Sequence, residues 1–246
     1  MVRTIDHETR RKAVLTATIN KFIREASPVS SEDIAKEFNL SPATIRNIFA
    51  ELEDANYLTH PYTSGGRIPT KKGYRYYVDF LISQFNLIEE EKEQINKEYR
   101  NKTCRLEDLL DKTSEIISSI THNTGIALFS EWRDKFFYRG ISQILRQPEF
   151  HDYQRIRHLI KLIEEKQYLI RIIKRDFRGR VKVYIGEELE CPEIENCAIV
   201  VSNYRLKDNS CGRIAVLGPM RMEYGHIISA VEYISGALSN SLSSQL

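Results

Sequence analysis

The sequence has few of the features that mark membrane, secreted or metal-binding proteins. No apolar run approaches the roughly 20 residues that a membrane-spanning helix requires. The charged start, MVRTIDHETRRKAVL, has no apolar core followed by a small-residue cleavage site. The four cysteines form no Cys-x-x-Cys pair, which argues against a disulfide framework or a zinc site: Cys104, Cys191, Cys197 and Cys211. We therefore expect a cytoplasmic protein with reduced thiols, no metal ion and no cofactor.

Catalytic motifs are also missing. The pair Gly65-Gly66, followed by Arg67, has the spacing of neither a P-loop nor a dinucleotide-binding turn. No G-x-S-x-G or H-E-x-x-H motif occurs, and the six histidines are isolated. Because nothing assembles a nucleophile, a base and an oxyanion donor, we expect no enzymatic activity. An enzyme or ligand-binding module with an incidental basic hairpin is a minor alternative.

The charges nearly balance, yet one segment has charge of a single sign. The chain has 36 Lys and Arg against 34 Asp and Glu, for a formal net charge of +2. Between Ala55 and Val78 there is no acidic residue, while four cations fall within that window: Arg67, Lys71, Lys72 and Arg75. Such local clustering predicts a site for an anion, and phosphate is the candidate.

The N-terminal region has the pattern of a helix-turn-helix. Apolar residues recur at helical spacing between Glu8 and Ala26, and a short second helix can start at Ser30 or Ser31. After a turn, Ser41 is a helix-capping residue and Pro42 suits the first helical position. This third helix is expected to bury four apolar residues: Ile45, Ile48, Phe49 and Leu52.

Two short strands, 57–60 and 67–68, are expected after the third helix. We expect a turn at Ser64-Gly65-Gly66, where glycine supplies positive φ values, with Arg67 at the hairpin tip. A helix-turn-helix followed by such a hairpin predicts a winged DNA-binding domain whose third helix enters the major groove of double-stranded DNA.

The side chains expected to contact DNA fall into two groups. Arg46 and Asn47 can form paired hydrogen bonds to guanine and adenine, and Ala43 or Thr44 can touch a thymine methyl group. Arg67 can enter a minor groove or bind phosphate, and the remaining wing cations and Tyr74 can bind phosphates. The expected set is Ser41, Ala43, Thr44, Arg46, Asn47, Arg67, Lys71, Lys72, Tyr74 and Arg75. Each could instead be an ordinary exposed helical residue.

The segment from Thr70 to His122 has no proline and, after Gly73, no glycine, so it favours helix. It contains a stripe of apolar residues separated by alternating steps of four and three, interrupted by Lys102 and Thr113. Two interpretations remain open: a dimer seam, or a helix packed on its own domain. The candidate dimer residues are Ile95, Tyr99, Leu106, Leu109, Ile116 and Ile120.

Beyond Gly125, strand-like runs alternate with helical segments. Strands are expected at 126–129, 136–141, 181–185, 197–204 and 213–217, and helices at 154–166 and 222–242. This order predicts an α+β domain with a mainly antiparallel sheet. The expected organisation is a winged-helix domain at 1–82, a helical linker at 83–122 and an α+β domain at 123–246.

Several of these segments together resemble the heat-inducible transcription repressor family, HrcA. The N-terminal resemblance rests on PVSS from Pro28, LSPATIRN from Leu40, ELE from Glu51, TSGGRIPT from Thr63 and KGYR from Lys72. The C-terminal resemblance, to the family's GAF-like domain, rests on RGIS from Arg139, QPEF from Gln147, IGEE from Ile185 and GRIAVLGPMRMEY from Gly212. Family members are usually longer, with an inserted dimerisation domain where Ser130–Lys135 stands here.

The resemblance implies a function for the whole chain. A family member would bind an inverted-repeat operator upstream of chaperone genes as a homodimer, and would depend on the GroE chaperonin to stay active. Heat would divert the chaperonin and relieve repression. The alternative is a winged-helix regulator whose C-terminal GAF-like domain senses a small ligand.

Overall fold

The computed structural model describes residues 2–62, 65–81, 86–100, 105–132, 135–206 and 210–245. The chain forms two compact units, Met1–Leu81 and Ile82–Leu246. The first unit ends next to the boundary expected from the sequence, whereas the segment expected to be a separate linker lies within the second unit. Among the described residues, no helix is both long and apolar enough to cross a membrane.

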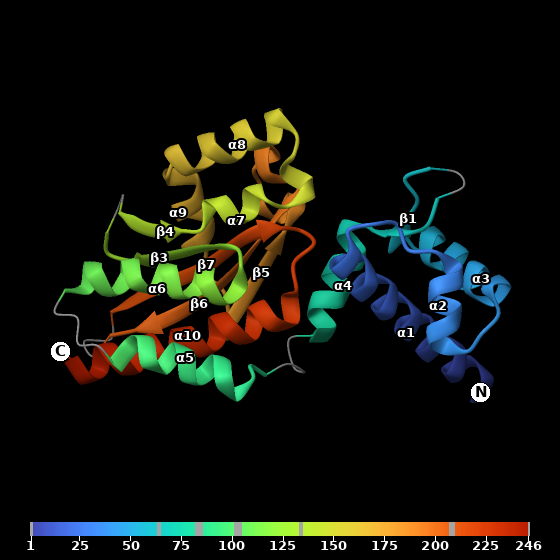
Figure 1. Cartoon of the computed structure of the whole chain (residues 1–246), viewed down its shortest axis with the longest axis horizontal. Helices are drawn as coiled ribbons and strands as arrows, with labels where there is room; N and C mark the ends of the chain where they lie inside the picture. The colour runs from blue at the N-terminus through green and yellow to red at the C-terminus, as the bar shows by residue number, and fades with distance from the viewer. Residues whose placement is uncertain are drawn as a thin grey trace. The chain divides into compact units, whose positions relative to one another are not determined.

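The first unit contains four helices and a two-stranded sheet (Figure 1). The elements are α1 (Val2–Glu25), α2 (Ser31–Phe38), α3 (Pro42–Asp54), β1 (Leu58–Thr59), β2 (Ile68–Pro69) and α4 (Lys71–Leu81). The hydroxyl oxygens of Ser30 and Ser41 accept hydrogen bonds from the first turns of α2 and α3, and Asn39 makes the left-handed turn between these helices. As predicted, Ile45, Ile48, Phe49 and Leu52 are buried. The sequence therefore sets both helix starts of the helix-turn-helix.

The two glycines of the wing have a different role from the one predicted. Neither Gly65 nor Gly66 has a positive φ, so the prediction that they supply left-handed turn residues is wrong. A Cβ on Gly66 would lie 2.6 Å from the carbonyl oxygen of Val29, closer than real Cβ contacts. Gly66 is needed because two backbone segments approach each other here. Ser64, the third residue of the predicted turn, lies outside the described residues.

The second unit is built on a five-stranded antiparallel sheet with strand order β4-β3-β7-β6-β5 (Figure 1). Its strands are β3 (Thr124–Phe129), β4 (Phe136–Arg139), β5 (Val181–Ile185), β6 (Cys197–Arg205) and β7 (Cys211–Pro219). The central pair has Val200 opposite Val216, and both side chains are fully buried. The predicted α+β class with an antiparallel sheet is confirmed.

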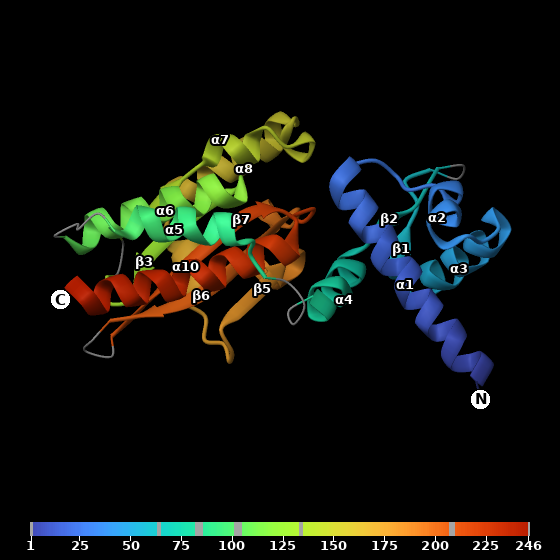
Figure 2. The same ribbon diagram turned by 60° about the horizontal axis from the view of Figure 1, so that its bottom comes forward.

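Helices cover both faces of this sheet, as Figures 1 and 2 show. One face packs on α6 (Leu106–Thr121) and α10 (Tyr224–Gln245), with α5 (Glu89–Arg100) against α10. The other packs on α7 (Ile141–Leu145), α8 (Tyr153–Glu164) and α9 (Gln167–Ile173). The short helix η1 (Pro148–Phe150) lies between α7 and α8, and η2 (Gly186–Leu189) and η3 (Pro192–Ile194) lie between β5 and β6. Strands buried on both faces explain why apolar runs in β6 and β7 are nearly continuous.

The apolar stripe at 95–120 lies inside this unit. It is divided between α5 and α6, which are separate helices, and Ile95 and Tyr99 are buried. The Tyr99 hydroxyl lies 2.9 Å from Thr113 Oγ1 on α6, and burial raises the pKa of Tyr99 well above its usual range. Leu109, Ile116 and Ile120 are also buried, and Leu106 is half-buried. Five of the six side chains are thus buried within their own chain, which favours helices packed on their own domain over a dimer seam at these residues. Lys102 lies outside the described residues.

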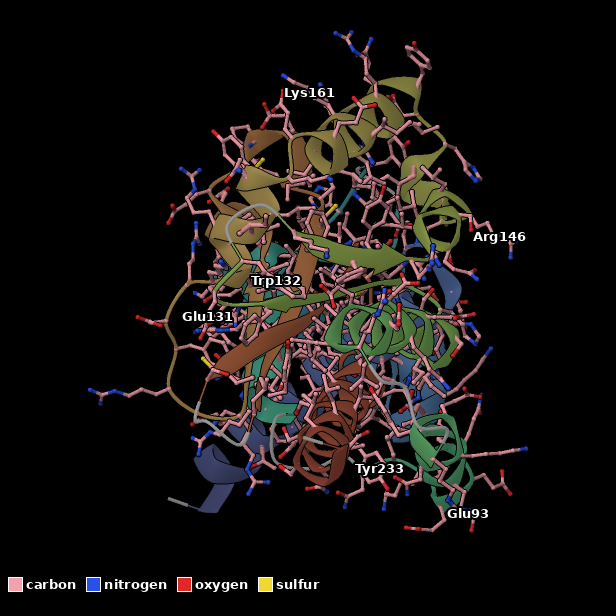
Figure 3. All side chains as sticks on the ribbon, turned by 90° about the vertical axis from the view of Figure 1, so that its left-hand side faces the viewer. Glu93, Glu131, Trp132, Arg146, Lys161 and Tyr233 are labelled. Atoms are coloured by element: carbon pink, nitrogen blue, oxygen red, sulfur yellow. The ribbon has the colours of Figure 1, made fainter. Side chains whose placement is uncertain are left out.

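The connection between β3 and β4 is short and packed at the sheet edge. Trp132 makes edge contacts with Phe129 and Phe137, at ring-centroid distances of 5.4 and 6.3 Å. The Lys135 ammonium lies 4.8 Å from the centre of the Trp132 ring. In Figure 3, Trp132 lies beside this edge, away from Lys161 on α8 and Glu93 on α5.

Candidate nucleic-acid interface

The outer face of α3 presents polar side chains with no partner. Arg46 and Asn47 are exposed, and neither has a hydrogen bond or ion pair within the described part of the chain. The buried face of the same helix fixes its orientation through Ile45 and Phe49, which are 0% and 2% exposed. A rigid helix with free guanidinium and amide groups is suited to hydrogen bonding with base edges.

The residues at the start of α3 include the helix cap and are largely exposed. The Ser41 hydroxyl oxygen accepts a hydrogen bond from the Thr44 backbone N–H at 3.0 Å, and the two hydroxyls lie 2.9 Å apart. Ser41 and Ala43 are exposed, and Thr44 is half-buried. Ser41 therefore orders the start of the helix, while Ala43 leaves a small apolar surface beside the polar groups.

Arg67 does not lie at the wing tip, so this part of the prediction is wrong. It immediately precedes β2, and its backbone forms two hydrogen bonds with Val29, of 2.8 and 2.9 Å. Its guanidinium lies 2.8 Å from Glu53 Oε2 on α3, and the side chain is only 23% exposed. Arg67 belongs to the base of the wing because the backbone bridge to Val29 fixes its position.

Three predicted phosphate-binding cations lie on α4. Lys72 is exposed, and its ammonium donates to the Ala55 carbonyl oxygen at 2.9 Å while lying 4.5 Å from the centre of the Tyr57 ring. Lys71 is half-buried, and Arg75 forms a 3.5 Å ion pair with Asp79. The three cations lie at the start of one helix, so they can form a positive edge beside the wing.

Tyr74 is a wrong prediction as a phosphate donor. Its side chain is 3% exposed and packs in the core of the first unit. Tyr77 is 4% exposed, and its hydroxyl donates to Asn20 on α1. A helix places residues three apart on one side, so Tyr74 and Tyr77 share the buried face of α4.

Glu53 and His60 also belong to this region, which the sequence does not predict. Glu53 Oε1 lies 2.6 Å from His60 Nδ1, and its other oxygen pairs with Arg67. Glu53 thus joins the end of α3 to both strands of the wing. The signal in the sequence is weak, because Glu53 is one of three acidic residues at the end of α3 and resembles an ordinary solvated side chain.

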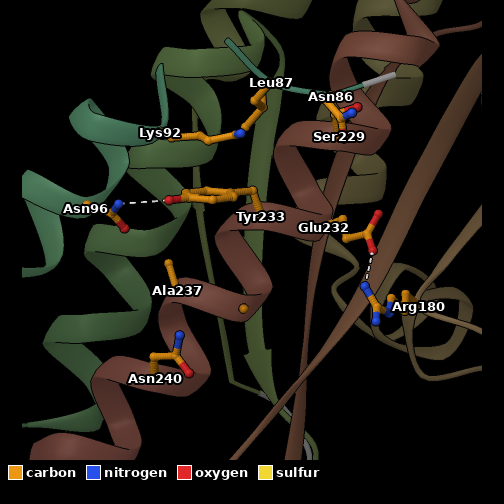
Figure 4. Close-up of a pocket in the computed structure, with 11 residues that line it drawn as sticks. Asn86, Leu87, Lys92, Asn96, Arg180, Ser229, Glu232, Tyr233, Ala237 and Asn240 are labelled. Carbon is orange, nitrogen blue, oxygen red and sulfur yellow. Dashed lines mark hydrogen bonds and ion pairs between the residues drawn. The ribbon is translucent and has the colours of Figure 1, made fainter. Parts of the chain in front are cut away.

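The second unit contains a groove between α5 and α10 (Figure 4), with a volume of about 360 Å³. Tyr233 crosses it, and its hydroxyl accepts a 2.8 Å hydrogen bond from Asn96. At one side Arg180 pairs with Glu232 at 2.9 Å. These polar groups pair with one another, so a ligand would have to displace existing contacts.

The cysteines of the second unit are suited to packing. Cys191 and Cys197 are 3% and 1% exposed, and burial raises the pKa of their thiols to about 11 and about 12. A hydrogen bond from Cys191 Sγ to Glu193 favours the protonated thiol of Cys191 further. Protonated thiols are poor metal ligands and nucleophiles. No cluster of His, Cys, Asp and Glu suited to a metal ion occurs in the described ranges, which exclude Cys104.

The helix-turn-helix, the exposed Arg46 and Asn47 on its outer face and the adjoining two-stranded wing together define a winged-helix DNA-binding regulator. Sequence comparison agrees in both units. Residues 8–79 match the family described as winged helix-turn-helix transcription repressor, HrcA DNA-binding, and residues 128–228 match the HrcA protein C terminal domain. The chain belongs to the HrcA family of heat-inducible transcription repressors, and it is a DNA-binding repressor, not an enzyme.

Individual relatives extend over nearly the whole chain. The heat-inducible transcription repressor HrcA of Carboxydothermus hydrogenoformans is 29% identical over 332 aligned positions, covering 94% of this chain and 97% of the relative. That of Bacillus pumilus is 29% identical over 335 positions, covering 95% and 97%. Because both alignments are longer than this chain of 246 residues, the relatives contain residues without a counterpart here.

A solved structure has the same fold over both units. It is described as the crystal structure of a hypothetical protein, is 18% identical and has a TM-score of 0.81. The match covers 96% of this chain and 99% of that chain.

Proposed function

We propose that the protein represses chaperone genes by binding an inverted-repeat operator as a homodimer. The observation that carries this proposal is the unpartnered pair Arg46 and Asn47 on the outer face of α3. A helix-turn-helix reads one half-site, so an inverted repeat requires two copies related by a twofold axis. The dimer would form through a surface other than the buried residues of α5 and α6.

The residues divide between base and phosphate contacts. Arg46 would bind guanine O6 and N7, and Asn47 adenine N6 and N7, while Ala43 and Thr44 would lie against a thymine methyl group. Ser41, at the exposed helix start, would approach a phosphate. The α4 cations would bind phosphates flanking the half-site: Lys71, Lys72 and Arg75.

Selection from a random duplex pool by the full chain tests the DNA part of the proposal. We expect the retained duplexes to contain an inverted repeat, and a gel shift at fixed salt to show tighter binding than to a scrambled duplex. Light scattering with and without the selected duplex measures how many protein copies associate and how many bind one duplex. Retention of unrelated sequences with equal affinity, or one copy per selected duplex, would contradict the proposal.

The proposed cellular partner is the GroE chaperonin, and the proposed location is the cytoplasm. If the chaperonin maintains the active repressor, adding it with ATP after mild heating should restore the DNA-bound fraction. The matched control is ATP with an inert protein at equal concentration. Equal recovery in both samples would remove the chaperonin from the proposal while leaving the DNA-binding role in place.

A further inference from the structure

The carboxylate of Glu53 connects the wing to the recognition helix α3. Glu53 Oε2 lies 2.8 Å from the Arg67 guanidinium, and Glu53 Oε1 lies 2.6 Å from His60 Nδ1. His60 follows β1, and Arg67 precedes β2. A single side chain near the end of α3 therefore contacts both sides of the wing hairpin.

The same arginine is also fixed from the opposite side. Its backbone exchanges two hydrogen bonds with Val29, which immediately precedes the Ser30 cap of α2. One guanidinium N–H also donates to the Gly65 carbonyl oxygen at 3.2 Å. Gly66 permits this arrangement because its missing side chain leaves the Val29 carbonyl close to the wing backbone. Arg67 thus connects the wing to the segments that position both helices of the helix-turn-helix.

Because the ion pair between Glu53 and Arg67 is partly buried, we expect it to stabilise the wing more than an exposed ion pair would. The side chains of Glu53 and Arg67 are 20% and 23% exposed. The Arg67 Nε atom is buried without a hydrogen-bond partner in the described part of the chain, so the Glu53 carboxylate is the charged group that compensates the guanidinium. Loss of Glu53 would leave a largely buried positive charge, which favours movement of the wing base toward water.

We propose that Glu53 and Arg67 are positioning residues for DNA binding, which hold the wing at a fixed orientation to α3, and that Arg67 is not itself a phosphate ligand. The inference rests on the proposed use of α3 and the wing in DNA binding. Glu53 would then favour DNA binding, although the negative charge of an acidic residue does not by itself predict this. Neutralising an acidic group near DNA by itself should leave affinity unchanged or raise it.

The test uses Glu53→Gln in the full chain, with the selected duplex as the probe. We expect E53Q to bind about five- to tenfold more weakly, between the effects of an exposed and a buried ion pair. The matched control is Asp54→Asn, which removes the same charge from the next, exposed position of α3. D54N should bind as tightly as wild type or slightly tighter. E53Q binding like D54N would overturn the inference.

A double-mutant cycle separates positioning from phosphate contact. If both residues act through one ion pair, Arg67→Ala should weaken binding as much as E53Q, and the double variant should be no weaker than either within about twofold. The dependence of affinity on salt should keep its wild-type slope. Additive losses, or a slope that falls by about one in R67A, would overturn the inference because Arg67 would then bind phosphate independently.

Two controls keep the result interpretable. Thermal unfolding of each variant shows whether binding is measured on folded protein; a variant that does not fold is replaced by Glu53→Asp or Arg67→Lys, which keep the charges and alter the reach. The same coupling and the same unchanged slope are expected. A wild-type chain that retains no duplex overturns the proposed function and this inference together, whereas normal wild-type binding with no E53Q effect overturns the inference alone.

Discussion

Two arginines, one in each unit, have opposite environments. In the first unit, Arg46 points from α3 without a partner in the described residues. In the second, Arg213 on β7 has a side chain only 10% exposed; it donates to the Arg175 carbonyl oxygen at 2.8 Å and stacks on Phe177 at 4.8 Å. An arginine whose donors are free is available to a ligand, whereas one whose donors are used by the chain's own carbonyl groups contributes to folding.

The largest expected effect tests the structural side of this comparison. Arg213→Met should lower the free energy of unfolding by about 2 to 3 kcal/mol, because the Arg175 carbonyl loses its charged donor. The matched control is Arg205→Met, an exposed arginine on the neighbouring strand β6, which should change stability by less than about 0.5 kcal/mol. Chemical denaturation followed by circular dichroism measures both. Equal losses would show that Arg213 has no special role.

Arg46→Ala tests the recognition side. We expect a loss of about 1 to 3 kcal/mol in binding the selected duplex and a relaxed preference at one base position, with stability nearly unchanged. Lys36→Ala, which removes an exposed cation from α2, is the matched control. Binding to single-base variants of the duplex measures the preference. Uniform weakening on every sequence would contradict base reading by Arg46.

A smaller effect is expected for Lys71→Ala and Lys72→Ala. Either change should weaken selected and scrambled duplexes alike and lower the salt slope by about one. Lys72 is the clearer case because it is exposed, and among the described residues its ammonium donates to the Ala55 carbonyl and lies over the Tyr57 ring. Titrations at several salt concentrations measure the slope. An unchanged slope would remove that lysine from the phosphate contacts.

The smallest effect near neutral pH concerns the buried thiols. In a Cys104→Ser background at pH 8, iodoacetamide should modify exposed Cys211 and spare Cys191 and Cys197, whose thiol pKa values are raised by burial to about 11 and about 12. The unfolded state loses these protons near pH 9 and the folded state only at higher pH. Their contribution to stability is therefore intact below pH 9 and falls between about pH 9 and 12. Rapid labelling of the native buried thiols would contradict this.

Local chemistry in the sequence predicts where a helix starts better than it predicts how distant segments pack. Ser41 and Pro42 mark the start of α3 through a cap and a preformed φ, and the structure has the helix start there. The role of Gly66, in contrast, depends on the close approach of the Val29 backbone, which lies far away in the chain. The α5 and α6 stripe misleads for a similar reason, since helical periodicity identifies an apolar face but not the surface that covers it.

The residues of the candidate site divide in the same way, between those that a local pattern predicts and those that depend on tertiary packing. Exposure of Arg46 and Asn47 follows from the periodicity of α3, whereas burial of Tyr74 depends on how α4 packs. Glu53 and Arg67 are separated by a hairpin, so no local pattern predicts their pairing. Ion pairs of this kind require the backbone geometry first, because the geometry determines which charged groups can meet.

The backbone bridge between Val29 and Arg67 also has a kinetic consequence. Its hydrogen bonds tie a loop near the start of α2 to a wing residue that follows α3 along the chain. Amide hydrogens in such connecting segments usually exchange rapidly by local fraying, but these two can exchange only when the wing and the helix-turn-helix separate. We therefore expect these two amide hydrogens to exchange together and more slowly than those of an ordinary loop, because one opening of the wing base exposes both.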